Sequence, residues 1–100
     1  MTIENLTSKN FLEQLHTTFQ AVRPDAVGLP LELIEVVDYA DNPKLEQFSL
    51  VFRGPRTPWL QQGMVQLEHS ALGSMELFIT PLGFDEVGMK YQAIINRFRK

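Results

Sequence analysis

Hydrophobic and polar residues alternate along most of the chain after residue 16, which is the periodicity of β-strands. The clearest segment is 47–53, where Phe48, Leu50 and Phe52 share one face and Arg53 lies on the other. Similar segments are bounded by glycine, proline or asparagine, which end strands. The alternation predicts strands at residues 17–23, 29–39, 47–53, 63–69, 75–80 and 89–98.

The residues before the first strand follow a different pattern. Thr7 or Ser8 can cap the first free amides of a helix, and Phe11, Leu12 and Leu15 form a short apolar stripe. The pattern predicts a helix of about two turns, which is too short to be stable alone in water. We therefore expect this helix to dock on the sheet.

Two interruptions of the alternation carry structural information. Within 29–39 the apolar positions change parity near Ile34 and Glu35, which predicts a bulge or a bend. Trp59 follows two prolines, and we expect its ring to pin the surrounding loop to the core rather than to bind a ligand. Loops or turns are predicted at 25–28, 41–44, 54–62, 71–74 and 81–88.

Short connections favour antiparallel pairing of successive strands, because a parallel crossover needs a dozen or more residues. A chain of 100 residues is expected to form one domain, residues 1–100. The predicted fold is mainly β, in the α+β class. It has about six antiparallel strands curled into a small barrel or a sandwich, and one short N-terminal helix caps it.

Composition excludes several kinds of chemistry. The chain has no cysteine, so it forms no disulfide, thiolate nucleophile or cysteine-bound metal centre. Its net charge of −3 argues against nucleic-acid partners and anionic membranes. We find no basic, apolar leader at the N-terminus and no apolar window of ~20 residues. A soluble, cytoplasmic protein is therefore expected.

The residues that could carry catalysis are few and poorly placed. The chain has two histidines, His16 and His69. Glu68 lies on the opposite strand face from His69, and His16 follows the helix, where we expect it to cap carbonyl groups. Nucleophile-elbow and phosphate-loop motifs are absent from the sequence. We therefore expect no catalytic residue, no metal and no cofactor, and a protein that is not an enzyme.

A second hypothesis stays open beside this one. Polar side chains that point inward among apolar ones could orient a small molecule inside the barrel or at its mouth. His69, Arg53 and Tyr91 are the residues that would form such a site. The chain would then be a small-ligand-binding barrel or a hydrolase.

Several apolar residues lie on the strand faces opposite the predicted core. We expect the helix and the Trp59 loop to bury them, whereas exposure would mark a surface for a protein partner or for self-association. The first hypothesis is therefore a non-enzymatic interaction or assembly module, acting through this face or an open sheet edge. The outward apolar residues are Val51, Met64, Phe78, Ile94 and Phe98. The candidate interaction surface comprises Phe78, Ile94, Phe98, Arg97 and Arg99.

Three segments together suggest a family. The motifs F-x-L-x-F-x-G-P at 48–55, L-F-I-x-P-x-G at 77–83 and Y-x-A-x-x-N at 91–96 resemble those of small bacterial proteins described as a domain of unknown function. The resemblance covers roughly residues 6–96. It implies a link to phage-tail-like collar proteins and hence an accessory or assembly role. His16 stands where such proteins are expected to have glycine, which puts the geometry of that turn in question.

Overall fold

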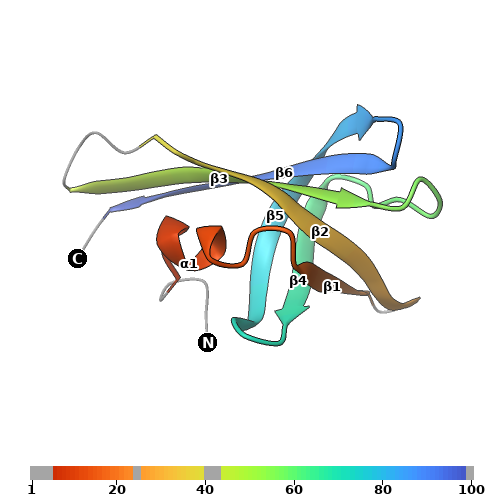
Figure 1. The fold of residues 1–100 in the computed structure, drawn as a ribbon, viewed down its shortest axis with the longest axis horizontal. Coiled ribbons are helices and arrows are strands. Elements are labelled where there is room, and N and C mark those ends of the chain that lie inside the picture. The colour runs from red at the N-terminus through yellow and green to blue at the C-terminus, as the bar shows by residue number, and fades with distance from the viewer. Residues whose placement is uncertain (1–5, 24–25, 40–43, 99–100) are drawn as a thin grey trace.

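The computed structural model describes residues 6–23, 26–39 and 44–98 (Figure 1). Within these ranges the chain forms antiparallel strands and a short N-terminal helix, which confirms the predicted mainly β class. The elements are α1 (Ser8–Leu12), β1 (Thr18–Arg23), β2 (Ala26–Asp38), β3 (Leu45–Gly54), β4 (Gly63–His69), β5 (Gly73–Phe84) and β6 (Met89–Phe98).

Three strands are longer than the alternation predicts, among them β3, which spans Leu45–Gly54 instead of 47–53. β2 begins at Ala26, inside the predicted loop 25–28, and β5 continues to Phe84, inside the predicted loop 81–88. Pairing with a neighbouring strand explains the extensions of β2 and β5, since β1 pairs with the start of β2 and β6 with the end of β5. β4 and β6 have the predicted bounds. Most of the predicted turn at 41–44 lies outside the described residues.

The strands close into a barrel in the order β1-β2-β3-β6-β5-β4. The prediction that successive strands pair is wrong at one connection. After β3 the chain crosses to β4, which pairs with β1, while β3 pairs with β6. The connection at 55–62 is long enough to make this crossing, and the result is a Greek-key arrangement.

The predicted bulge in β2 is present. Its register against β3 shifts between Leu33 and Glu35, which confirms the change of parity seen in the sequence. Leu31 and Leu33 are fully buried before the shift, and Val36 packs against the core after it. The bulge therefore keeps a long strand apolar toward the interior.

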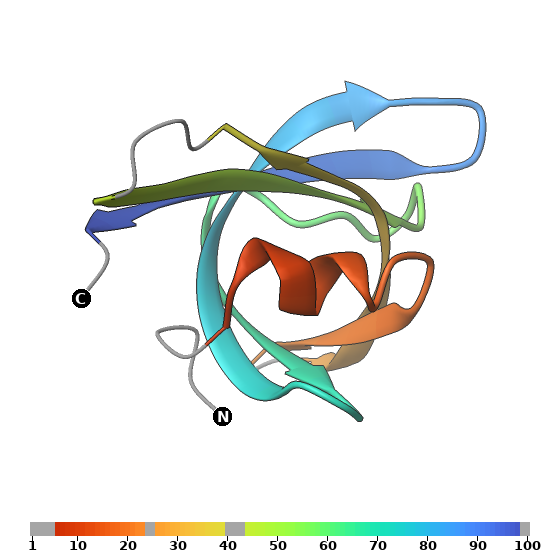
Figure 2. The same cartoon turned by 60° about the vertical axis from the view of Figure 1, so that its left-hand side comes forward.

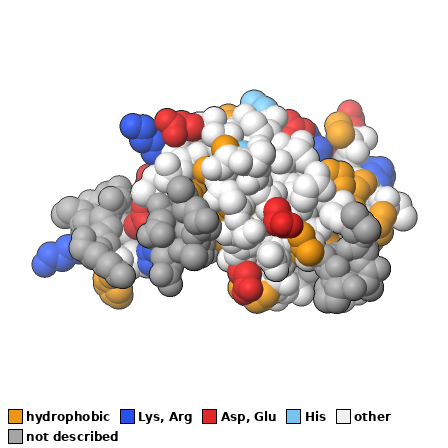
Figure 3. All heavy atoms as spheres, turned by 90° about the horizontal axis from the view of Figure 1, so that it is seen from below, with side chains coloured by type: hydrophobic (Ala, Val, Ile, Leu, Met, Phe, Trp, Pro, Cys, Tyr) orange, Lys and Arg blue, Asp and Glu red, His pale blue; other side chains and the backbone are white. Residues whose placement is uncertain are grey.

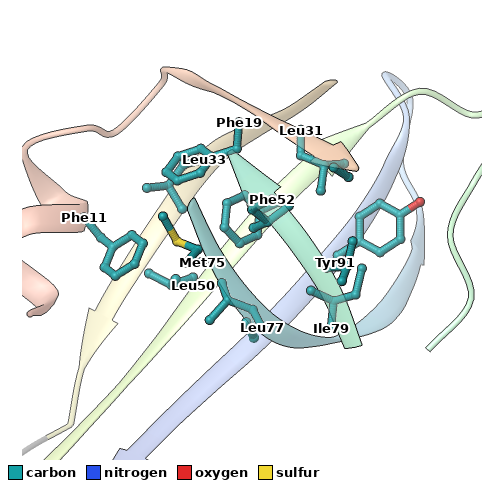
Figure 4. Packing of buried hydrophobic residues seen from close by; sticks show 14 of the residues in the cluster. Phe11, Phe19, Leu31, Leu33, Leu50, Phe52, Met75, Leu77, Ile79 and Tyr91 are labelled. Atoms are coloured by element: carbon teal, nitrogen blue, oxygen red, sulfur yellow. The ribbon is translucent and has the colours of Figure 1, made fainter. Parts of the chain in front are cut away.

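Apolar side chains fill the interior of the barrel (Figure 4). The rings of Phe19 and Phe52 meet edge to face with 5.3 Å between their centroids. Burying a large apolar side chain contributes roughly 1.5–3 kcal/mol, so this core is the main source of stability. The fully buried large side chains are Leu6, Phe11, Phe19, Leu31, Leu33, Phe48, Leu50, Phe52, Leu67 and Tyr91.

Helix α1 lies across one opening of the barrel (Figure 2). Thr7 caps it as predicted: its Oγ1 accepts from the Asn10 amide, and the Asn10 side chain accepts from the Thr7 amide. Phe11 enters the core, with its ring centroid 6.3 Å from that of Phe19 and 5.8 Å from that of Phe48. In the described part of the chain, no helix has the length and apolar character that crossing a bilayer requires.

His16 adopts a left-handed backbone conformation, with φ 68°, in the turn that follows α1. This is the conformation that glycine adopts without strain, so the position is one that favours glycine. The His16 amide donates to the Leu33 carbonyl at 2.7 Å, and its Nδ1 lies 3.4 Å from Glu32 Oε2. The expectation that this side chain caps helix carbonyls is wrong, because the ring turns to β2 instead.

Substitutions at two neighbouring residues of α1 test whether the helix closes the barrel through Phe11. We expect Phe11→Ala to lower the free energy of unfolding by about 3–5 kcal/mol, because it empties a fully buried site. Leu12 is 54% exposed, and we expect Leu12→Ala to change that free energy by less than about 0.5 kcal/mol. Urea denaturation measures both. Equal losses would show that α1 does not close the barrel through Phe11.

Candidate functional site

The structure does not bring His69, Arg53 and Tyr91 together. Arg53 lies on the outer face, where its Nε and Nη2 donate to Asp85 Oδ2 at 2.9 and 2.7 Å. Tyr91 is inside, and its hydroxyl accepts from the Leu60 amide at 2.7 Å (Figure 4). His69 lies beside the segment that follows α1. These side chains therefore do not converge on one ligand.

His69 is held by hydrogen bonds at both ring nitrogens. Nδ1 accepts from the Ala71 and Leu72 amides at 3.0 and 3.2 Å, so the proton is on Nε2. Nε2 therefore donates to Thr17 Oγ1 at 2.8 Å, and that hydroxyl donates to the Gln14 carbonyl. Burial lowers the pKa of the imidazole. His69 thus joins the β4–β5 turn to the segment after α1.

The outward apolar residues are mostly exposed, so the expectation that they are buried is wrong. The exposed fractions are 49% for Phe78, 62% for Ile94 and 83% for Phe98. Met64 is also exposed and lies directly opposite Phe78 across β4 and β5. Helix α1 closes the end of the barrel, so it leaves these outer faces open. Val51 alone of the five is buried, on a strand flanked by β2 and β6.

Arg97 does not belong to that exposed surface. It has the inward parity of Ile95 on β6, and its Nε donates to Glu46 Oε1 at 2.6 Å. Its Nη2 donates to the Leu6 carbonyl, and its Cζ lies 6.0 Å from the centre of the Phe48 ring. Arg97 therefore fastens the segment before α1 to the sheet. Arg99 lies outside the described residues.

The loop at 55–62 is anchored differently from the prediction. Leu60 is 6% exposed and is the residue that enters the core, whereas Trp59 is 44% exposed. The Trp59 ring meets Phe84 edge to face at 6.1 Å between centroids, and Arg56 Cζ lies 4.9 Å from the centre of the Phe84 ring. The expectation that Trp59 pins the loop is therefore wrong. Its indole is presented at the surface.

Asp85 forms hydrogen bonds within the β5–β6 turn, next to Trp59, Phe84 and Arg56. Its Oδ1 accepts from the Val87 and Gly88 amides at 2.8 and 2.7 Å, while Oδ2 accepts from Arg53. The Gly88 amide and then the Arg53 guanidinium lower the pKa of Asp85 to about 2. Its carbonyl oxygen accepts from Arg56 Nη1 at 2.6 Å. One residue thus fixes the β5–β6 turn and both arginines.

A groove of about 560 Å³ lies beside Trp59. It was not predicted, because its walls come from segments that the Greek-key crossing brings together. The signal in the sequence is the run Gln61-Gln62-Gly63 after the tryptophan. The groove is lined by Val22, Trp59, Leu60, Gln61, Gln62, Gly63, Met64, Val65, Gln66, Glu76 and Ile79.

Charged side chains are scattered over the face seen in Figure 3, and much of this surface is uncharged. In the described ranges, no group of three or more histidine and acidic residues is placed to hold a metal ion. The side chains of His69, Asp85 and Arg97 each form several hydrogen bonds within the protein, and these bonds stabilise the fold. Two features are candidates for contact with another molecule: the Trp59 groove and the exposed apolar side chains Met64, Phe78, Ile94 and Phe98.

These features define a class of protein, a small closed Greek-key barrel with a helix across one end. The chain belongs to the family described as domain of unknown function (DUF6916), which matches residues 6–95. This confirms the prediction that the chain belongs to a family of small proteins described as a domain of unknown function. No curated protein and no solved structure matches the chain.

Stability should fall as the pH drops below 6.5, the ordinary pKa of histidine. In the unfolded chain, His69 takes up a proton near that pH. In the folded chain, His69 is protonated only at lower pH, because burial lowers the pKa of its imidazole. We expect the urea midpoint to decrease from pH 7 toward pH 5 and His69→Asn to flatten this dependence. An unchanged slope in the variant would contradict the structural role of His69.

Asp85 gives a second test. We expect Asp85→Ala to lower the thermal unfolding midpoint and to shift Trp59 emission to longer wavelength, because the loop behind the indole loses its anchor. In the wild type, the same stabilisation is present above pH 3.8 and is lost as the pH falls toward about 2. Glu86→Ala, one residue away and exposed, is the control and should change neither signal. Wild-type emission in Asp85→Ala would refute the anchor.

Proposed function

We propose that this protein is a non-enzymatic interaction module that docks a protein partner on the outside of β5 and β6. The observation that carries the proposal is the exposure of Phe78, Ile94 and Phe98, three large apolar side chains with no core role. Exposed apolar side chains that take no part in the core can form interaction surfaces on soluble domains. Aromatic side chains are also enriched at protein interfaces.

The chemistry of the polar residues supports a role without catalysis. His69 uses both ring nitrogens in structural hydrogen bonds, so neither is available as a general base. The hydroxyl of Tyr91 is bonded to the Leu60 amide, and Arg53 is paired with Asp85. The alternative, a ligand site or hydrolase built from His69, Arg53 and Tyr91, is less favoured because each side chain already has a partner.

The class of partner follows from the family resemblance. The motifs at 48–55, 77–83 and 91–96 resemble a family that we link to phage-tail-like collar proteins. We therefore propose an accessory role in such an assembly, with a structural protein as the partner. A docking surface of rigid strands suits this role, because ordered strands lose little conformational freedom on binding.

The double variant Phe78→Thr/Ile94→Thr tests the surface. Threonine suits a strand, so we expect the free energy of unfolding to change by less than about 1 kcal/mol while binding is lost. Affinity capture from the source cells, quantified by mass spectrometry, should recover a protein with the wild type and at least about tenfold less with the variant. Light scattering on the purified chains separates a partner from self-association.

Val87→Thr is the matched control, since Val87 is 69% exposed in the β5–β6 loop, away from Phe78 and Ile94. It should recover the same protein as the wild type. The proposal fails if the wild-type chain is monomeric and recovers nothing that the double variant loses. Recovery of a protein unrelated to any phage-tail-like structure would overturn the proposed accessory role alone.

A further inference from the structure

The groove beside Trp59 is lined in part by the connection between β3 and β4. This connection lies on the other side of the barrel from α1 (Figure 1). The volume of the groove, about 560 Å³, falls in the ~300–1,000 Å³ range of small-molecule sites. Trp59 forms part of its wall and is held in place by Phe84 and, behind that ring, by Arg56. The indole is therefore positioned before any ligand arrives, which lowers the entropy cost of binding.

The polar side chains of the groove are available to a ligand. Gln61, Gln62, Gln66 and Glu76 line it, and Gln66 stands opposite Glu76 across β4 and β5. In the described ranges, none of these four side chains forms a hydrogen bond or an ion pair with the rest of the protein. Three side-chain amides, each a donor and an acceptor, thus line the same groove as one exposed indole.

The charge of the groove narrows the class of ligand. Glu76 is the one ionisable side chain among the described lining residues, and none of them is a lysine, arginine or histidine. A phosphate or a polyanion would find no cation here and would meet a carboxylate. The ligand that fits these walls is uncharged, with several hydroxyl groups and an apolar surface.

We propose that this groove binds a neutral oligosaccharide. One face of a sugar ring presents C–H groups, which pack on an indole, while the hydroxyl groups on its rim donate and accept hydrogen bonds. The three glutamines and Glu76 supply the complementary groups. Gly63 adds no side chain to the groove, and its missing Cβ would meet nothing within 4 Å, which leaves the floor open.

A proline-rich peptide is a less suitable occupant. Grooves that bind such peptides are lined with aromatic rings that the proline side chains pack between. The lining of this groove contains one aromatic ring and four polar side chains. Such a lining is better suited to the hydroxyl groups of a sugar than to the pyrrolidine rings of proline. The inference goes beyond the proposed protein-binding function and does not rest on it.

Trp59 is the single tryptophan of the chain, so its fluorescence reports directly on the groove. We expect the wild-type protein, titrated with maltotriose, cellotriose and chitotriose, to show a saturable emission change for at least one sugar, with a Kd of about 10 mM or tighter. Gln62→Ala and Gln66→Ala should each raise that Kd about fivefold, because each removes a hydrogen bond to the sugar.

Gln92→Ala on β6 is the matched control, since Gln92 does not line the groove, and its Kd should equal that of the wild type. For Trp59→Phe, calorimetry replaces fluorescence and should show weaker binding. The proposal is overturned if no sugar gives a saturable change at about 50 mM, or if both glutamine variants bind like the wild type. Saturation by decaproline without any response to the sugars would assign the groove to a peptide.

Discussion

The pairing of β1 with β4 closes the sheet, and the rest of the structure depends on it. This seam is short, with Gln20, Ala21 and Val22 opposite Glu68, Leu67 and Gln66. It joins the first strand of the barrel to β4, so that the sheet closes on itself and neither of these strands is left at an outer edge. The seam requires β4 to leave β3 and cross the barrel, and that crossing places the Trp59 loop over one end.

The two ends are closed by different means. At one end, Phe11 fills the opening, and Arg97 ties the segment before the helix to Glu46. At the other, Leu60 enters the core under the hydroxyl of Tyr91, while Asp85 fixes the neighbouring turn. Buried polar groups are costly unless they are paired, and these paired groups hold the chain crossings. The proposed binding functions therefore use other residues, namely exposed side chains such as Phe78, Ile94 and Trp59.

Strand alternation made most of the fold predictable. It identified β4 and β6 at their observed bounds and located the bulge in β2, because parity maps directly onto inside and outside. Strand order was not predictable, since β1–β4 pairing joins segments far apart in the chain. Arg97 has the same parity as the buried Ile95, although it was assigned from the sequence to the candidate interaction surface. Phe78 and Ile94 were correctly assigned to the outer face, but their exposure depended on where α1 docks.

The two proposed surfaces meet at Met64. This residue lines the Trp59 groove and stands opposite Phe78 across β4 and β5. A protein seated on Phe78 would therefore cover the border of the groove, and its own side chains would contact a sugar bound there. Any free energy gained in that contact would make each ligand strengthen the binding of the other, because coupling between two sites is reciprocal. Together, the two proposals would make the barrel a link between a protein and an oligosaccharide, with Met64 at the border of the two sites.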